Sequence, residues 1–245
     1  MADALSIAVQ SMQNDMLRMD HISLNVANST TPGYRRVLSS NVDFADVLHR
    51  TAVYDTARNI PVILPVVTMV VDTTAGPIKS SGQPLDLALS GDGYFEVITP
   101  HGPAYTRAGN FHIDEGGRLV NQDGFAVSGK GGEIFLSGKA VPVISADGEV
   151  SDGDIAAGQL RIIAFSDKHG LQMGSNGLLV PSTAEADQIE SSATVKSGYL
   201  ESSNVTPLNE MVRMLETSRH FESQQKLFQG YDEQMSAAIQ KLGQF

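Results

Sequence analysis

The sequence predicts an α+β fold, in which a discontinuous N- and C-terminal helical coiled-coil stem carries a central all-β domain. Near both ends of the 245-residue chain, apolar residues recur at alternating steps of four and three, the spacing of a helix that packs a narrow stripe against another helix. Between the ends, short β-prone segments alternate with turns rich in Gly, Asp and Ser, as in compact β domains. We therefore expect a stem from residues 1–35 and 199–245, an extended linker at 36–74 and a β domain at 75–198.

The first helix is expected from residue 3 to about residue 27. Its stripe consists of Leu5, Val9, Met12, Met16, Met19 and Val26, with Ser23 in the one polar slot. Pro32 disfavours helix at the residue before it, and a Pro-Gly pair favours a type II turn in which the glycine takes a positive φ. The chain is therefore expected to change direction at Pro32 and Gly33.

The linker and the β domain follow this turn. A short helix is expected around Phe44–His49. The apolar run Ile60–Val71 is twelve residues long and contains two prolines, so it favours extended chain and is too short for a membrane span of about 20 residues. The expected strands of the β domain are Tyr94–Thr99, Ala104–Arg107, Asn110–Ile113, Leu119–Asn121, Phe125–Ser128, Ile134–Leu136, Val141–Ile144, Leu160–Phe165 and Leu178–Pro181.

The second helix is expected from Thr206 and Pro207 to about Leu242. Thr is a favourable N-cap, Pro suits the first helical position, and Glu210 lies near the positive end of the helix dipole. The stripe of this helix consists of Phe221, Phe228, Tyr231, Met235, Ala238 and Leu242, with Gln224 as its polar slot. The stripe shifts by one step between Leu215 and Phe221, which predicts a locally irregular seam.

Composition excludes several classes of function. The net charge of −11, with 17 scattered Lys and Arg residues, disfavours nucleic acid as a partner. The absence of cysteine rules out a disulfide framework and a thiol nucleophile. The N-terminus lacks the basic start and apolar block of a secretory signal, so export is expected to take another route.

No motif predicts catalysis or ligand binding. Gly124–Lys130 matches the start of a phosphate-binding loop, but Gly131 stands where Ser or Thr is required. The acidic segment Asp147–Asp154 lacks the spacing of an EF-hand and is interpreted as turn carboxylates rather than a calcium site. The six histidines lack metal-ligand spacing, and no serine lies in a nucleophile elbow. We therefore expect no catalytic residue, cofactor, metal or small-molecule substrate.

Methionines concentrate on the two expected helices, which leaves two interpretations open. Met packs almost anywhere, so these side chains fill a core or provide adaptable packing between subunits. The residues are Met12, Met16, Met19, Met211, Met214 and Met235.

Four ordered blocks of residues resemble the bacterial flagellar rod and hook proteins. The first is Asn25–Arg35, which reads NVANSTTPGYR and departs from the family pattern at Leu24, where a second Asn is usual. The others are Pro84–Phe95, Tyr105–Phe111 and Gly198–Val205, the last continuing to Lys226. Within the family, the short length and the Pro84–Leu89 segment are most similar to the proximal rod members, and the distal rod members come second.

The resemblance implies a structural subunit of the flagellar basal-body rod in the periplasm, with no membrane insertion and no enzymatic activity. It implies that the paired terminal helices form an inner tube that transmits torque and carries exported subunits, and that the β domain forms the outer layer. The implied partners are copies of the chain, other rod proteins and the flagellar type III export apparatus, which accounts for a missing cleaved signal peptide. The expected assembly interface is Leu5, Val9, Met12, Met16, Met19, Asn25, Asn28, Pro32, Gly33, Tyr34, Asn204, Met211, Leu215, Phe221, Phe228, Tyr231, Met235 and Leu242.

Two other classes of function remain open from the residues. A secreted β-rich adhesin or binding module would use the stem only to oligomerise, and an exposed apolar patch on the β domain would favour it. A wall hydrolase would need two carboxylates about 5 to 9.5 Å apart in a cleft, and the sequence nominates no such pair. The rod role is preferred, because a lone helix hairpin leaves the far side of each stripe without a partner and heterologous contacts between stems generate helical tubes.

Overall fold

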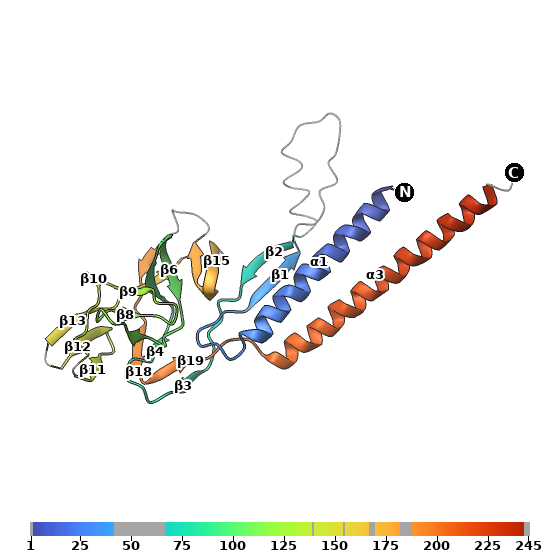
Figure 1. Cartoon of the computed structure of the whole chain (residues 1–245). Helices are drawn as coiled ribbons and strands as arrows, with labels where there is room; N and C mark the ends of the chain where they lie inside the picture. Colours follow the sequence, from blue (N-terminus) through green and yellow to red (C-terminus); the bar gives the residue numbers. More distant parts are fainter. Residues whose placement is uncertain are drawn as a thin grey trace. The chain divides into compact units, whose positions relative to one another are not determined.

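A computed structural model describes residues 2–41, 67–138, 140–153, 155–166, 170–181 and 188–242. The chain forms two compact units (Figure 1). The helical unit comprises Met1–Val26, Ser39–Met69 and Thr206–Phe245, and the β unit comprises Ala27–Leu38 and Val70–Val205. The predicted mixture of terminal helices and a mostly β central region is therefore confirmed. The domain boundaries given above stay a prediction.

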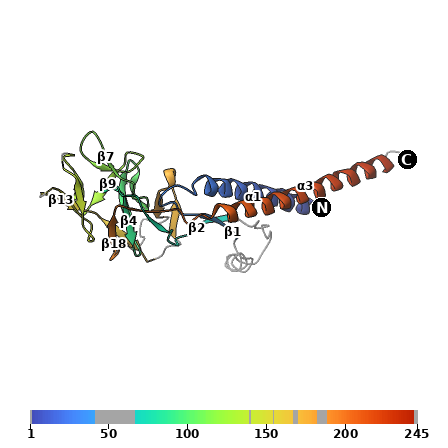
Figure 2. The same cartoon turned by 90° about the horizontal axis from the view of Figure 1, so that it is seen from below.

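Two long helices, α1 (Ala2–Ala27) and α3 (Pro207–Leu242), dominate the helical unit. Both agree closely with the predicted helices, because the signals at their ends are local. The Glu210 amide donates to the Thr206 carbonyl oxygen at 3.2 Å at the start of α3, and Gly33 takes the predicted positive φ of 68° in the turn after α1. The helices run side by side in opposite directions (Figures 1 and 2). Neither contains, among its described residues, an apolar stretch long enough to cross a bilayer.

The described strands of the chain form five sheets. The strands are β1 (Val37–Asn41), β2 (Val67–Val71), β3 (Ile78–Ser80), β4 (Leu87–Ser90), β5 (Tyr94–Thr99), β6 (Gly102–Thr106), β7 (His112–Ile113), β8 (Leu119–Val120), β9 (Ala126–Gly129), β10 (Gly132–Glu133), β11 (Pro142–Ile144), β12 (Glu149–Asp152), β13 (Ile155–Gln159), β14 (Ile162–Phe165), β15 (Leu171–Met173), β16 (Leu179–Pro181), β17 (Gln188–Glu190), β18 (Thr194–Ser197) and β19 (Tyr199–Glu201), with a 3-10 turn η2 (Ser175–Gly177) before β16. The largest sheet has ten strands in the order β15-β16-β6-β5-β9-β8-β7, with β10 beside β9, and β14 between β5 and β17. The others are β11-β12-β13, β18-β4, β19-β3 and β1-β2.

The central strand β5 is buried on both faces. Phe95 and Val97 point into the main apolar cluster, and Tyr94 points into a second, smaller cluster, because successive side chains of a strand alternate between faces. Edge-to-face ring contacts lie in both clusters, with Phe95 and Phe111 at 5.2 Å and Tyr105 and Phe165 at 4.8 Å between centroids. This core fixes the strands that lead to the junction described below.

Several strands differ from the predicted ones. Residues 134–136 form no strand, and Phe135 makes only an isolated bridge to Arg118. The pairs β4–β18 and β3–β19 were not expected, because each joins segments more than 100 positions apart and such pairing leaves no local signal. In the segment resembling a phosphate-binding loop, Ala126–Gly129 form strand β9 and Lys130 and Gly131 form the turn to β10, so no helix follows it. The predicted helix at 44–49 and the first part of the apolar run, residues 60–66, lie outside the described residues.

Candidate assembly interface

Polar pairs join α1 to α3. Asn25 Nδ2 donates to Glu210 Oε2 at 3.2 Å, His220 Nδ1 lies 2.6 Å from Asp15 Oδ2, and Gln224 Nε2 donates to Ser11 Oγ at 2.7 Å. Passing from one pair to the next takes ten and then four residues on each helix. The antiparallel register is therefore constant along this seam, and the irregularity predicted between Leu215 and Phe221 is not found in it.

The seam is built on buried polar residues. Asn25 and Glu210 are each 1% exposed, and Asp15 and Thr217 are also buried, with Ile22 as the buried apolar member on α1. Buried polar groups in a helix seam cost stability relative to apolar packing but specify how the helices align. The apolar stripes therefore did not predict that the seam is mainly polar.

The predicted stripe of α1 does not form this seam. Seam residues Ser11, Asp15, Ile22 and Asn25 each directly precede a stripe position, which rotates the seam by about 100° around the helix. Val9 and Met16 of the stripe are exposed at 40% and 53%. The expectation that the apolar stripes form the contact between the two helices of one chain is therefore wrong, because the polar seam forms it.

The remaining predicted interface residues of the helices vary in burial. On α3 the predicted polar slot Gln224 does lie in the seam, and Phe221 and Phe228 are half-buried. Half-buried residues on and after α1 are Met12, Met19 and Asn28, and exposed residues on α3 are Met211, Leu215 and Tyr231. The side chains of Leu5, Met235 and Leu242 lie outside the described residues. The assignment of all these residues to an assembly interface stays a prediction.

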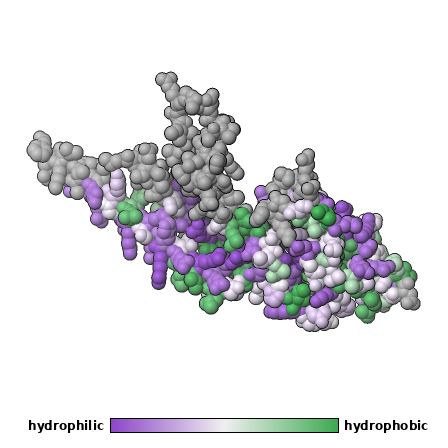
Figure 3. All heavy atoms as spheres, turned by 180° about the vertical axis from the view of Figure 1, so that it is seen from behind, coloured by the Kyte–Doolittle hydropathy of each residue, from purple (hydrophilic) through white to green (hydrophobic). Residues whose placement is uncertain are grey.

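Exposed apolar side chains gather on the sides of both helices that face away from the seam. Advancing about 100° per residue puts these residues roughly opposite the seam positions. They lie on opposite sides of the helix pair, and we call them together the outer apolar face: Val9, Met16, Leu17 and Leu24 on α1, and Leu208, Met211, Val212 and Leu215 on α3. Figure 3 shows green apolar residues between purple ones on one side of the molecule. Sequence reasoning missed Leu17, Leu24, Leu208 and Val212 because only positions that fit a narrow stripe were counted.

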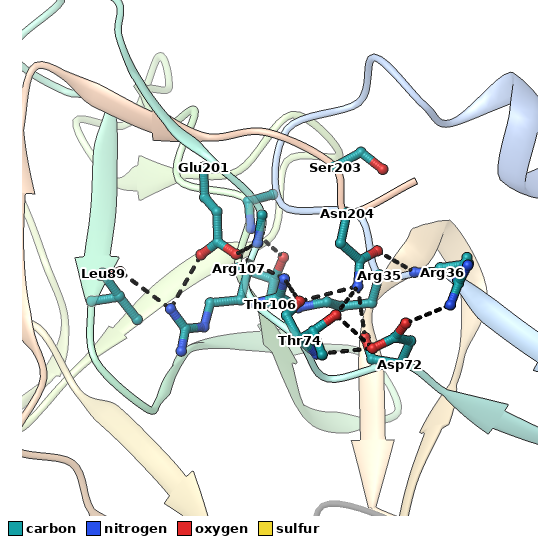
Figure 4. A network of polar contacts seen from close by, with 12 residues as sticks. Arg35, Arg36, Asp72, Thr74, Leu89, Thr106, Arg107, Glu201, Ser203 and Asn204 are labelled. Atoms are coloured by element: carbon teal, nitrogen blue, oxygen red, sulfur yellow. Dashed lines mark hydrogen bonds and ion pairs between the residues drawn. The ribbon is translucent and has the colours of Figure 1, made fainter. Parts of the chain in front are cut away.

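A buried cluster of charged residues, here called the junction, holds the segment that follows α1 and the segment that precedes α3 (Figure 4). Glu201 at the end of β19 is 1% exposed, and its carboxylate accepts from Arg35 Nη1 at 2.7 Å and from Arg107 Nη1 at 3.1 Å. Arg107 also donates to the carbonyl oxygens of Leu89 and Gly91, and Gly76 N donates to Glu201 Oε1 at 2.9 Å. Charged groups at this depth are stable only when paired and hydrogen-bonded. Glu201 therefore ties together three segments that are distant in the sequence.

Asn204 and Asp72 extend the junction. Asn204 Oδ1 accepts from Arg36 N at 2.7 Å, and its Nδ2 donates to the carbonyl oxygens of Asp72 and Thr74 at 3.0 Å. Arg36 also pairs with Asp72 at 2.9 Å. Burial acts to raise the pKa of Asp72, but hydrogen bonds from Thr74 and the charge of Arg36 outweigh it and hold the pKa below its ordinary value. The carboxylate of Asp72 is therefore stabilised in its charged form.

The stability of the β unit is expected to fall in acid through Asp72. A carboxyl whose pKa is lowered by folding stabilises the protein above its unfolded pKa of about 3.9, and this contribution is lost as pH falls through the lower folded value. The substitution Asp72→Asn should reduce stability at pH 7 and flatten its dependence on pH below about 5. Urea unfolding between about pH 7 and 2.5 measures this. An unchanged acid slope in Asp72→Asn would show that the lowered pKa of Asp72 contributes nothing to stability.

The turn after α1 packs directly on the junction. Gly33 N donates to the Glu201 carbonyl oxygen at 2.7 Å, and a Cβ on Gly33 would lie 2.1 Å from Ala108 N. Pro32 is half-buried and Tyr34 is buried. These residues and Asn204 were predicted as interface residues, and the structure brings all four to the junction.

Sequence reasoning missed the charged members of the junction. Arg35, Arg107 and Glu201 all lie in the blocks that resemble flagellar proteins, but charged residues are mostly exposed in proteins, so no burial was assigned to them. The signal available was their place inside otherwise apolar or Gly-rich blocks. No group of His, Cys, Asp or Glu able to hold a metal ion occurs among the residues that the structure describes.

Comparisons with known proteins agree with the blocks. The family described as "Flagellar hook protein FlgE/F/G D1 domain" matches residues 88–152, and "Flagellar basal body rod FlgEFG protein C-terminal" matches residues 196–241. The basal-body rod protein FlgG of Bacillus subtilis is 33% identical, covering 95% of this chain and 96% of that protein. FlgF of Caulobacter vibrioides is 30% identical over 99% of each chain, and FlgF of Salmonella typhimurium is 32% identical over 89% of each. The chain therefore belongs to the flagellar basal-body rod proteins, a family of structural components of the basal body and not of enzymes.

Proposed function

We propose that this protein is a rod subunit that assembles through its terminal helices into the axial tube, which transmits torque and carries exported subunits. The observation that carries the proposal is the outer apolar face, which lies opposite a polar seam in the same helix pair. A helix pair inside one chain would be expected to have the reverse arrangement, apolar within and polar outside.

The outer apolar face needs neighbours. Burying a large apolar side chain contributes about 1.5–3 kcal/mol, and the face has eight such side chains. A contact between this face on one subunit and a different face on the next is heterologous, and heterologous contacts that do not close generate helical assemblies. The partners are copies of this chain and other rod proteins, which carry related terminal helices.

The place in the rod and the route to it are also proposals. The Pro84–Leu89 segment and the short chain favour the proximal rod protein FlgF, and the distal rod protein FlgG is the runner-up, since relatives of both names match nearly the whole chain. Export through the flagellar type III apparatus to the periplasmic rod is proposed because basal-body rod proteins match nearly the whole chain.

Leu215→Asp is expected to abolish swimming while leaving the monomer folded. Leu215 is 61% exposed in the single chain, so a carboxylate there costs the monomer little, but the same carboxylate buried against a neighbour would be strongly disfavoured. A swimming assay in a strain lacking the native gene, with circular dichroism of the purified variant, measures both effects.

Gln225→Asp provides the matched control, because it adds the same charge at an exposed polar position of α3. Normal swimming is expected from it. If Leu215→Asp also swam normally and entered purified basal bodies, the outer apolar face would not be an assembly surface.

A binding role for the β unit is a second candidate, and one observation favours it. Val141 and Val143 are exposed on and beside the edge strand β11 of the sheet β11-β12-β13, the kind of apolar surface expected of a binding module. Val143→Asp should then release a partner from the rod without preventing rod assembly. Basal bodies of normal composition from this variant would remove the candidate.

A further inference from the structure

We propose that the polar pairs of the seam determine the register in which α1 pairs with α3, and disfavour pairing of either helix with a helix of another rod protein that lacks the matching residues. The inference rests on the proposed assembly through terminal helices, because only there are many similar helices brought close together. It assigns a role to Asn25–Glu210, Asp15–His220 and Ser11–Gln224 that differs from that of the outer apolar face.

The burial of these pairs is poorly explained by stability alone. Replacing buried ionic or polar pairs with apolar residues of similar volume is often neutral or stabilising, whereas a single mismatched partner is costly. Asn25 and Glu210 are almost fully buried, and Asp15 is buried beneath His220, whose own side chain is 59% exposed. A polar residue at a helix seam is best attested as a device that fixes register and partner.

Shifting the helices by one heptad removes the pairs. In one direction Asp15 would face Leu227, and a buried carboxylate against an apolar side chain is strongly disfavoured. In the other direction Asn25 would face Ser203, which precedes the start of α3, and would lose Glu210, although Asp15 would then face Arg213 and Glu210 would face Arg18. Only the observed register satisfies the three pairs together.

The same pairs discriminate against helices of other rod proteins. Another copy of this chain carries the same residues and would satisfy the pairs equally well. A foreign helix that lacks a donor opposite Asp15 or Glu210 leaves a buried carboxylate without its partner, and removing one partner of such a pair is the costly case. The pairs act in this way as positioning residues, and the outer apolar face supplies the contact area.

Cysteine cross-linking of the full-length chain tests the proposal without background, because the chain contains no cysteine. The observed register sets Arg18 opposite Thr217, three residues from Asp15 and His220 on each helix. Arg18→Cys with Thr217→Cys is therefore the in-register probe. Asn14→Cys with Phe228→Cys is displaced by one heptad, toward the register in which Asp15 would face Leu227, and is the shifted probe.

In the otherwise native chain, the in-register probe should cross-link and the shifted probe should cross-link little. Asp15→Leu, Asn25→Leu, Glu210→Leu and His220→Leu together should raise cross-linking in the shifted probe by about tenfold or more. Four changes away from the seam, Gln13→Ala, Asp20→Ala, Glu216→Ala and Glu222→Ala, should leave both readings unchanged.

Exchanged pairs keep the proposal testable if the apolar variant does not fold. Asn25→Glu with Glu210→Asn, and Asp15→His with His220→Asp, preserve each pair in reversed orientation and should restore the native pattern. Cross-linking that is native in the apolar variant, or scrambled in the exchanged variant, would overturn the proposal. The Leu215→Asp variant should keep the native cross-linking pattern even though it does not swim, which separates failure of this inference from failure of the assembly role.

Discussion

Replacing Glu201 with alanine is expected to destabilise the β unit by about 3–5 kcal/mol, the range measured when one partner of a buried ion pair is removed. Arg35 and Arg107 would then lie buried without their shared carboxylate. Burial already lowers the pKa of Arg107, against the opposing effect of Glu201, so loss of the carboxylate removes the main compensation for burying that charge. Gly76 N would lose its acceptor as well.

Urea unfolding followed by far-ultraviolet circular dichroism measures this loss. Glu190→Ala is the matched control, because Glu190 pairs with Lys130 at 3.4 Å while its side chain is 73% exposed, and exposed pairs contribute about 0–1 kcal/mol. Glu201→Gln should give an intermediate loss, since it keeps an acceptor but not the charge. Equal stability of the Glu201 and Glu190 variants would contradict the central role of Glu201.

Gly33→Val should disrupt the turn after α1 and abolish swimming. Its φ of 68° is disfavoured for a β-branched residue, which costs about 1–3 kcal/mol. In addition, the new Cβ would lie 2.1 Å from Ala108 N and 2.2 Å from the Arg107 carbonyl carbon. The turn would have to leave its place on the junction, and its hydrogen bond to Glu201 O would be lost.

Gly82→Val separates the two causes. Gly82 has a similar φ of 76°, but nothing lies within 4 Å of the position of its Cβ. This variant should show the backbone strain alone, with a smaller loss in urea unfolding and normal swimming. If the two variants lost the same stability, the close approach to Arg107 and Ala108 would have no energetic weight.

Local signals made the helices predictable. Thr206 and Pro207 start α3, and Pro32 and Gly33 lie in the turn after α1, as sequence rules for helix ends require. The apolar spacing correctly identified both helices but not the side on which they meet. That side is polar, and periodicity counts apolar residues, so Asp15 and Asn25 gave no signal that they would be buried in a helix seam.

Contacts between distant segments were not predictable from one sequence. Nothing near Glu201 indicates that Arg35 and Arg107, 166 and 94 positions away, would surround it. The pairing of β18 with β4 has the same limitation, since register between remote strands is set by the folded core. The interface residues Gly33, Tyr34 and Asn204 were singled out by resemblance, and their packing at the junction gives that resemblance a physical basis.

The junction also lowers the entropic cost of bringing α1 and α3 together. Asn25 and Glu210 are 185 positions apart, and closing a flexible loop costs an entropy that grows as (3/2)RT ln n. Once Asn204 is bonded to Tyr34 O and Arg36 N, only about 15 flexible residues separate the two partners, which lowers the closure cost by roughly 2 kcal/mol. If the β unit forms first, α1 and α3 therefore meet at a lower entropic cost than in the open chain. Glu201 belongs to neither helix. Substitutions at Glu201 that open the junction should nevertheless weaken the pairing of α1 with α3, because the full loop between the helices must then be closed.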